Sequence, residues 1–197
     1  MRMTRSIELT RPDYDVRLRP LSERDELFIQ HWTENASPLL SGYNYGNMTL
    51  AERRAWLKSK QRMHRRYFAV DIPERPLIGY IGAKDINPLS RTAMLGIVFD
   101  PAFQSQGYGT QALDLFLSYY FDEWGMSALE LDVNQFNDRA LALYRRAGFE
   151  FVRELTERFE NQDIDFDDPK LRPFRSCFVQ HGGVLYAKIW RMRKEQR

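Results

Sequence analysis

The sequence predicts an α+β fold (mixed α/β), with one mixed central sheet of about six to seven strands and helices on both faces. Two observations predict this fold. Alternating or β-rich segments occur both in direct succession and separated by helical segments, which is typical of a sheet with antiparallel and parallel neighbours. The length of 197 residues suits one domain over 1–197. Within it we expect 1–15 to be a flexible N-terminal extension and 157–183 to be irregular.

The first half of the chain predicts a strand, two helices and then three strands. Alternation of apolar and polar residues over 16–21 predicts the first strand. Ser22 is placed to cap the first helix, and Thr49 with Glu52 forms a capping box for the second. The first helix is expected at 25–33, the loop after it at 35–47 and the second helix at 49–64. The three strands are expected at 67–72, 77–86 and 93–99.

The second half alternates strands with helices. A helix over 109–124 is expected to end at Gly125, and a shorter helix over 138–147 at Gly148, because glycine commonly terminates helices. Strands are expected at 129–133, 149–153 and 184–192, with a polar, irregular stretch over 157–175.

Composition excludes several classes of protein. The 29 basic and 27 acidic residues give a net charge of only +2, which argues against a surface built to bind nucleic acid. The single cysteine, Cys177, allows no intrachain disulfide or thiol cluster, and the scattered histidines lack metal-ligand spacing. No apolar run approaches the roughly 18 residues of a membrane span, and no apolar stretch follows the basic N-terminus. We therefore expect a cytoplasmic protein without membrane, nucleic-acid or metal partners.

The strongest chemical signal is the turn before the helix over 109–124. Its sequence is Gln104-Ser105-Gln106-Gly107-Tyr108-Gly109-Thr110. Glycines let backbone N–H groups approach a ligand, and a helix N-terminus presents unpaired donors with a partial positive charge. The turn therefore predicts an anion site suited to a phosphate or pyrophosphate, with a plain strand–turn–helix connection as the alternative. A P-loop is excluded because Gly-Lys-Ser/Thr is absent.

A dinucleotide-binding fingerprint is a weaker alternative for the same turn. Gly107, Gly109 and Ala112 fit its G-x-G-x-x-G/A form, and two acidic residues follow near the expected position. However, residues 100–106 separate the strand from the first glycine, and too little chain remains for a full doubly wound sheet.

A second motif makes the pattern specific. Asn137 is placed to cap the short helix, and Ala140, Leu143 and Tyr144 share one of its faces. Together, the two motifs resemble the acyl-CoA binding core of the GNAT superfamily of N-acetyltransferases: Gln104-x-x-Gly107-x-Gly109 and Asn137-x-x-Ala140-x-x-Leu143-Tyr144-x-x-x-Gly148-Phe149. The segments VRLRPLSERD, ERRAWL and LIGYIGAKDI are also similar to the group within it that acetylates ribosomal-protein N-termini at alanine or serine. The resemblance covers about 16–153.

The resemblance implies a GNAT-like fold and an acyl-CoA-dependent N-acyltransferase. Acetyl-CoA would be the donor, and a primary amine of a protein N-terminus, a polyamine or another small molecule would attack it directly in a ternary complex. The turn would hold the pyrophosphate of coenzyme A, and the strand before it would pair with the pantetheine amides. The implied cofactor-binding residues are Ile97, Val98, Phe99, Gln104, Ser105, Gln106, Gly107, Tyr108, Gly109, Thr110, Asn137, Arg139 and Tyr144.

The resemblance also implies catalytic roles. Tyr144 would protonate the departing thiolate, and Asp132 stands where the N-terminal acetylating enzymes usually carry a glutamate base. Because aspartate is one methylene shorter, a water relay is favoured. Asp85 and Glu130 are alternative bases. The acidic stretch 157–168 would border the acceptor groove and attract a cationic amine, or is a solvated loop.

Several alternatives stay open at this point. The basic run 58–66 is typical of a solvated helix end, although it could also contact RNA or an acidic substrate, including a carboxylated acyl group. No motif marks the acyl chain, so succinyl-CoA is an alternative donor. A non-catalytic acyl-CoA-binding sensor or partner module is an alternative function. A homodimer follows only by analogy with the family.

Overall fold

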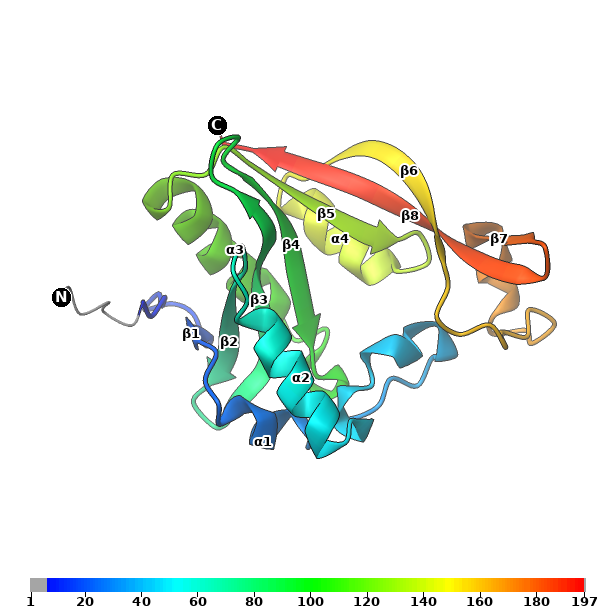
Figure 1. Ribbon diagram of the computed structural model, residues 1–197, viewed down its shortest axis with the longest axis horizontal. Helices are drawn as coiled ribbons and strands as arrows, with labels where there is room; N and C mark the ends of the chain where they lie inside the picture. The colour runs from blue at the N-terminus through cyan, green and yellow to red at the C-terminus, as the bar shows by residue number, and fades with distance from the viewer. Residues whose placement is uncertain (1–6, 197) are drawn as a thin grey trace.

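The computed structural model describes residues 7–196 and confirms the predicted fold class (Figure 1). One mixed sheet of eight strands carries helices on both faces. Of the extension expected over 1–15, residues 1–6 lie outside the described residues. Leu9 exchanges two backbone hydrogen bonds with Leu18, so the expected extension is tied to the first strand at Leu9. Among residues 7–196, no helix combines the length and apolar character that a membrane crossing requires.

The strands and helices follow in the predicted order. The strands are β1 (Arg17–Pro20), β2 (Arg66–Ile72), β3 (Arg75–Asn87), β4 (Thr92–Phe99), β5 (Ala128–Asn134), β6 (Glu150–Arg158), β7 (Phe178–His181) and β8 (Val184–Glu195). The helices are α1 (Asp25–Ile29), α2 (Leu50–Lys60), α3 (Tyr108–Ser118) and α4 (Asp138–Arg146). The short helical turns are η1 (Pro38–Tyr43), η2 (Tyr45–Asn47), η3 (Pro101–Phe103), η4 (Tyr119–Glu123) and η5 (Arg172–Cys177).

The sheet has the order β1-β2-β3-β4-β5-β8-β6, with β7 paired to β8. β4 and β5 are parallel neighbours, whereas the other pairs are antiparallel. The β4–β5 pairing joins only Thr92–Met94 to Ala128–Glu130, after which the two strands diverge (Figure 1). The sheet is therefore split at its centre, between one half around β3 and another around β8.

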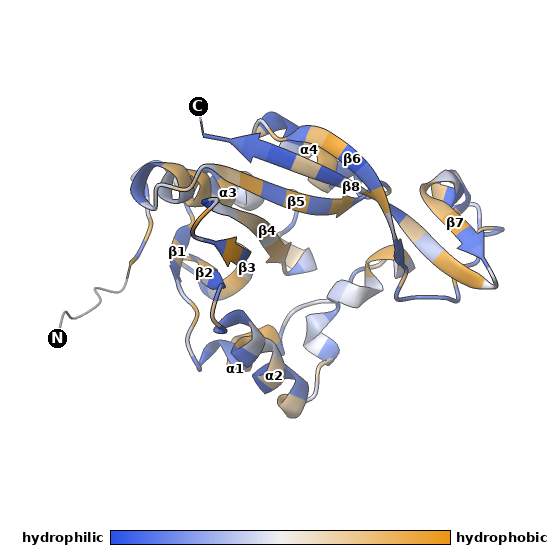
Figure 2. Ribbon diagram, turned by 45° about the horizontal axis from the view of Figure 1, so that its top comes forward, coloured by the Kyte–Doolittle hydropathy of each residue, from blue (hydrophilic) through white to orange (hydrophobic). Residues whose placement is uncertain are grey.

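Apolar side chains bury both faces of the sheet. Along β2, Phe68 and Val70 join the core under α3, whereas Tyr67 and Ala69 pack with α1 and α2, as the alternation of a strand requires. In Figure 2, β3 and β4 are largely hydrophobic, whereas the C-terminal end of β8 is hydrophilic. That end of β8 carries arginines that form ion pairs with β5.

Two local predictions about helix starts have different outcomes. The capping box at α2 is confirmed, since Thr49 Oγ1 accepts from the Glu52 N–H at 3.3 Å and Glu52 Oε2 accepts from the Thr49 N–H at 2.7 Å. Ser22 does not cap α1, and Arg24 holds the N-cap position. The buried Asp25 side chain instead accepts the Ser22 N–H at 2.7 Å, because its ion pair with Arg19 holds it at this turn.

The segment 157–183 is more regular than the sequence predicts. β6 extends to Arg158 instead of ending near 153, and η5 and β7 follow within the segment. A third apolar cluster holds this region to η1; its members are Leu39, Phe136, Phe159, Leu171, Phe178, Leu185 and Ala187. The sequence concealed it because these residues are scattered among charged ones without a helix or strand period.

Candidate active site

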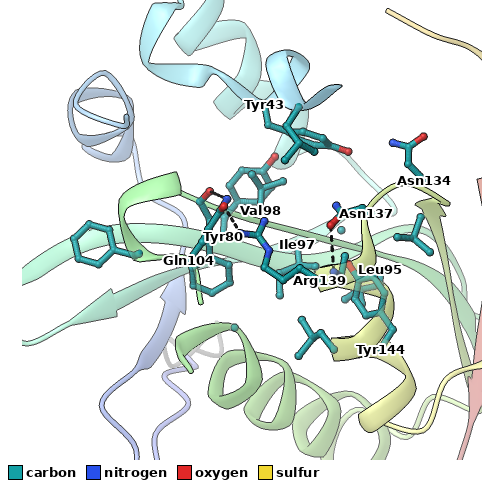
Figure 3. Close-up of a pocket in the computed structure, with 18 of the residues that line it drawn as sticks. Tyr43, Tyr80, Leu95, Ile97, Val98, Gln104, Asn134, Asn137, Arg139 and Tyr144 are labelled. Atoms are coloured by element: carbon teal, nitrogen blue, oxygen red, sulfur yellow. Dashed lines mark hydrogen bonds between the residues drawn. The ribbon is translucent and has the colours of Figure 1, made fainter. Parts of the chain in front are cut away.

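The divergence of β4 and β5 opens a cavity of about 660 Å³ (Figure 3). Residues 95–99 of β4 and 132–134 of β5 form its floor. We call one side the turn wall, made by the turn 104–110 and by Asn137, Arg139 and Tyr144 of α4. We call the other the aromatic wall; it consists of Tyr43, Tyr45, Tyr67 and Tyr80 with Lys60, Arg65 and Lys84.

Backbone groups of both strands face the gap without a strand partner. Asp100 donates its N–H to Ile78 at 2.9 Å, so by the alternation of an antiparallel ladder the even-numbered residues of β4 face β3. Gln135 donates to Lys188 at 3.0 Å, so the odd-numbered residues of β5 face β8. The groups that point into the gap are therefore the N–H and C=O groups of Ile97, Phe99, Asp132 and Asn134 and the C=O of Leu95, because the Met94–Glu130 bridge uses the Leu95 N–H. An extended amide chain between the strands would find partners on both sides.

The turn before α3 places backbone N–H groups at the start of a helix. Ser105 and Gly107 have positive φ values of 62° and 91°, and left-handed residues within a turn are typical of backbone anion sites. Gly107 is the N-cap residue of α3, and no side chain caps this helix, in contrast to α2 and α4. The free N–H groups and the partial positive charge of the helix end therefore remain available to an anion.

Two side chains hold the turn against α4. Gln104 Nε2 donates to the Phe99 carbonyl at 3.2 Å, and Arg139 donates to Gln104 Oε1 (Figure 3). Asn137 caps α4 as predicted, because its Oδ1 accepts the Ala140 N–H at 3.2 Å. Arg139 and Arg146 add positive charge to this part of the lining, which suits a phosphate-bearing ligand.

Tyr144 lies on α4 with its side chain only 8% exposed, and it lines the cavity. Its ring packs edge-on against Phe149 at a centroid distance of 5.9 Å. Burial, with a smaller contribution from Tyr43, raises the pKa of Tyr144 above that of a free tyrosine. The hydroxyl therefore keeps its proton at neutral pH and can act as a hydrogen-bond donor or an acid.

The three predicted bases differ in position. Asp132 lines the cavity, but its two carboxylate oxygens accept from Nε and Nη2 of Arg191 at 2.8 and 2.7 Å. Glu130 pairs with Arg193 at 2.9 Å and lies outside the cavity lining. Asp85 is exposed and also outside the lining. Only Asp132 is thus placed to face a ligand here, and an ion pair already occupies its oxygens.

The structure gathers most of the predicted cofactor-binding residues around this one cavity. The lining includes Ile97, Val98, Phe99, Gln104, Ser105, Gly107, Gly109, Thr110, Asn137, Arg139 and Tyr144. Gln106 and Tyr108 are outside it: Gln106 Nε2 donates to the Ala102 carbonyl at 2.7 Å, and the Tyr108 ring packs near Phe103.

The aromatic wall is what the sequence reasoning missed. Tyr43 and Tyr45 come from the segment predicted only as a loop, and Tyr67 and Tyr80 from strands predicted only as core. Lys60 and Arg65 belong to the basic run that was interpreted as a solvated helix end, but both line the cavity. The one available signal was the density of tyrosines and cations between 43 and 84.

Residues 15–150 match the model of a protein family described as "Acetyltransferase (GNAT) domain". The chain belongs to the GNAT family of acetyltransferases. This membership confirms the enzyme class predicted from the two motifs, with acetyl-CoA as the acyl donor. The split between β4 and β5 and the uncapped start of α3 are therefore features of a GNAT acetyltransferase.

The chain is also similar to curated relatives and, in its fold, to solved structures. The chain is 27% identical over 170 residues to a spermidine N(1)-acetyltransferase of Escherichia coli K12, covering 85% of this chain and 88% of that one. Its fold is similar to that of a spermidine N-acetyltransferase from Vibrio cholerae in complex with CoA and spermine (TM-score 0.69, 23% identity, 92% and 96% coverage). A GNAT-family acetyltransferase from Bacillus anthracis is similar too (TM-score 0.69, 16% identity, 96% and 99% coverage).

The finer resemblance to the ribosomal-protein N-terminal group is not supported, since the curated relative reported above is named a spermidine N(1)-acetyltransferase. The segments on which it rested build β1, α2 and β3, which belong to the framework of the fold. They line the cavity at only a few positions, so they carry little information about the acceptor.

Proposed function

We propose that this protein transfers the acetyl group of acetyl-CoA to a primary amine that attacks the thioester directly in a ternary complex. The observation that carries the proposal is the set of backbone groups without a strand partner in the β4–β5 gap, together with the uncapped start of α3. Pantetheine amides would pair with β4 as an added strand, and the pyrophosphate would lie on the turn 104–110. Arg139 would add charge beside it.

The chemistry needs an oxyanion donor, an acid and a base. As the neutral amine attacks, the C–N bond forms, and an N–H of β4 facing the gap stabilises the oxyanion. The C–S bond then breaks, and Tyr144 donates a proton to the departing thiolate. The amine proton passes to Asp132 through water, because Arg191 occupies the carboxylate oxygens directly.

A polyamine is the first acceptor to assay, because the relatives are named for spermidine and spermine. One local feature would attract the ammonium form of any such amine. Burial, with smaller contributions from Tyr45, Glu160 and Glu157, raises the pKa of Tyr43 to about 12, so two carboxylates lie near this part of the aromatic wall. Negative charge at this mouth of the cavity would draw in an ammonium group.

The test is calorimetric titration with acetyl-CoA, followed by thiol release in the presence of spermidine, spermine and simple amines. Saturable acetyl-CoA binding, with no binding of NADH, and amine-dependent thiol release are expected. Acetyl-CoA binding without transfer to any amine would favour the acyl-CoA-binding sensor instead. Absence of acetyl-CoA binding would overturn the proposal.

A further inference from the structure

Three cations meet on the aromatic wall, on the α2 side of the sheet. Lys60 is the last residue of α2, Arg65 precedes β2, and Lys84 lies on β3, and all three line the cavity. Arg65 is anchored, since its Nη1 donates to the Ser59 carbonyl at 3.1 Å. Desolvation first, and then the charges of Arg65 and Lys84, lower the pKa of Lys60 to about 8. We call these three residues the cation recess.

The recess adjoins the place where the acyl group would react. Lys60 Nζ lies 4.8 Å from the ring centroid of Tyr67 and 4.7 Å from that of Tyr80. The Tyr67 hydroxyl in turn lies against β4, where a Cβ added to Gly96 would meet it at 2.6 Å. A single tyrosine ring therefore separates the Lys60 ammonium from the strand that borders the gap.

The recess has no ion-paired counter-charge in the described part of the chain, and the exposed Asp85 carboxylate acts on the neighbouring Tyr67, whose pKa it helps to raise. Lys60, Arg65 and Lys84 are all half-buried, and none forms an ion pair among residues 7–196. By contrast, Arg19, similarly withdrawn from solvent, is bound by the buried carboxylates of Asp25 and Asp71. A half-buried cation that has only aromatic or carbonyl contacts, and no anionic partner, remains costly, and an entering anion would relieve that cost.

We propose that the cation recess binds a carboxylate carried by the acceptor, so that the preferred acceptor is a primary amine with a carboxylate a few bonds away. This inference rests on the proposed acetyl transfer to an amine and narrows its acceptor. A second ammonium, as in a polyamine, would meet three like charges at this position. A carboxylate on the acyl group could reach the same recess, and the experiment below separates the two sources.

The test uses three acceptors with the same carbon chain and the same reacting amine. Butylamine ends in a methyl group, γ-aminobutyrate in a carboxylate and putrescine in a second ammonium. With acetyl-CoA, kcat/KM for γ-aminobutyrate is expected to exceed that for butylamine about tenfold, with putrescine lowest, because a contact with a charged group contributes at least that factor. Shorter and longer chains of each type locate the best spacing.

Lys60→Met removes the charge and shortens the unbranched side chain by only one atom. It is expected to reduce the ratio of kcat/KM for γ-aminobutyrate over butylamine about tenfold. Lys58→Met is the matched control, since Lys58 is exposed on the same helix and outside the cavity lining. It should leave the ratio unchanged. Thermal unfolding of both variants verifies that they are folded.

The outcomes are distinguishable. Preference for putrescine or spermidine, with a ratio that Lys60→Met does not alter, overturns the recess while leaving acetyl transfer intact. If succinyl-CoA transfer to butylamine depends on Lys60 and γ-aminobutyrate transfer does not, the carboxylate belongs to the donor and the acceptor assignment is wrong. If no amine is acetylated, the proposed function fails. Titration of γ-aminobutyrate into the protein then decides the recess alone: Lys60-dependent binding supports it, and absence of binding overturns it.

Discussion

The two walls of the cavity are built in different ways. The turn wall consists of two continuous stretches of chain, and it acts largely through backbone groups at the start of α3 and through the cap of α4. The aromatic wall takes its side chains from η1, η2, α2, β2 and β3 and from Arg65 just before β2, and it presents phenol rings and three cations. The turn wall is suited to the part of a ligand that all members of a family bind, and the aromatic wall to a part that varies among the members.

This difference teaches where specificity resides. The free N–H groups at a helix start accept any phosphate-bearing group of the right size. Substitutions on the turn wall should therefore weaken the binding of every acyl-CoA and lower activity with every amine. A wall of separate side chains discriminates by charge and shape, so substitutions there should change the ranking of acceptors.

The largest effect is expected for Gly107→Glu on the turn wall. The side chain adds strain at φ +91° and places a carboxylate beside the proposed pyrophosphate position, so acetyl-CoA affinity should fall about a hundredfold or more. Gly125→Glu is the matched control, because Gly125 has φ +71°, equally open surroundings and a position outside the cavity lining. Calorimetry should show weakened binding for the first variant alone. Equal losses would mean that strain, and not the anion site, explains the effect.

Tyr144→Phe is expected to lower kcat about a hundredfold with little change in the KM for acetyl-CoA, because it removes the proposed acid and preserves the packing. Tyr186→Phe, on β8 and outside the cavity lining, serves as control. Thiol release under saturating substrates is the measurement. A kcat within about twofold of the parent would remove Tyr144 from the mechanism.

Asp132→Asn separates a catalytic role from a structural one. As a base, Asp132 supports turnover, and its loss should lower kcat about tenfold to a hundredfold. Arg191→Gln breaks the same ion pair from the other side and leaves the carboxylate in place. We expect both variants to lose thermal stability to a comparable degree, and only Asp132→Asn to have a reduced kcat. A similar kcat loss in both would mean that the ion pair itself is what matters.

The smallest effect is a pH dependence of acceptor preference. Lys60 has a pKa of about 8, so the recess loses one positive charge as the pH rises through this value. The advantage of γ-aminobutyrate over butylamine should therefore decline about threefold between pH 7 and 9. Taking the ratio cancels the titration of the reacting amine, and Tyr67, with a pKa of about 12, does not titrate in this window. A ratio that is independent of pH would exclude Lys60 as the responsive group.

The same shift gives a stability signature. Because the pKa of Lys60 is lower in the folded protein than its ordinary value of 10.5, the unfolded chain binds more protons between pH 8 and 10.5. The free energy of unfolding should rise with pH across that window, and Lys60→Met should remove this contribution. Denaturant unfolding at several pH values measures it, with Lys58→Met as the reference.

The sequence by itself determined the framework and the turn wall. Strand alternation, the Thr49–Glu52 capping box and the cap at Asn137 report local backbone geometry, and the glycine turn likewise carries its conformation in its own residues. Such features depend on neighbours within a few positions along the chain, so they can be predicted without knowing what packs against them.

Only the tertiary structure decided the aromatic wall and the state of the carboxylate. Lys60 and Arg65 lie in a run that is typical of a solvated helix end, and the packing of α2 against β2 and β3 turned them toward the cavity. The antiparallel register of β5 and β8 placed Arg191 opposite Asp132 and engaged both of its oxygens. These contacts join residues far apart in the chain, and their energies depend on register and burial, which no local pattern encodes.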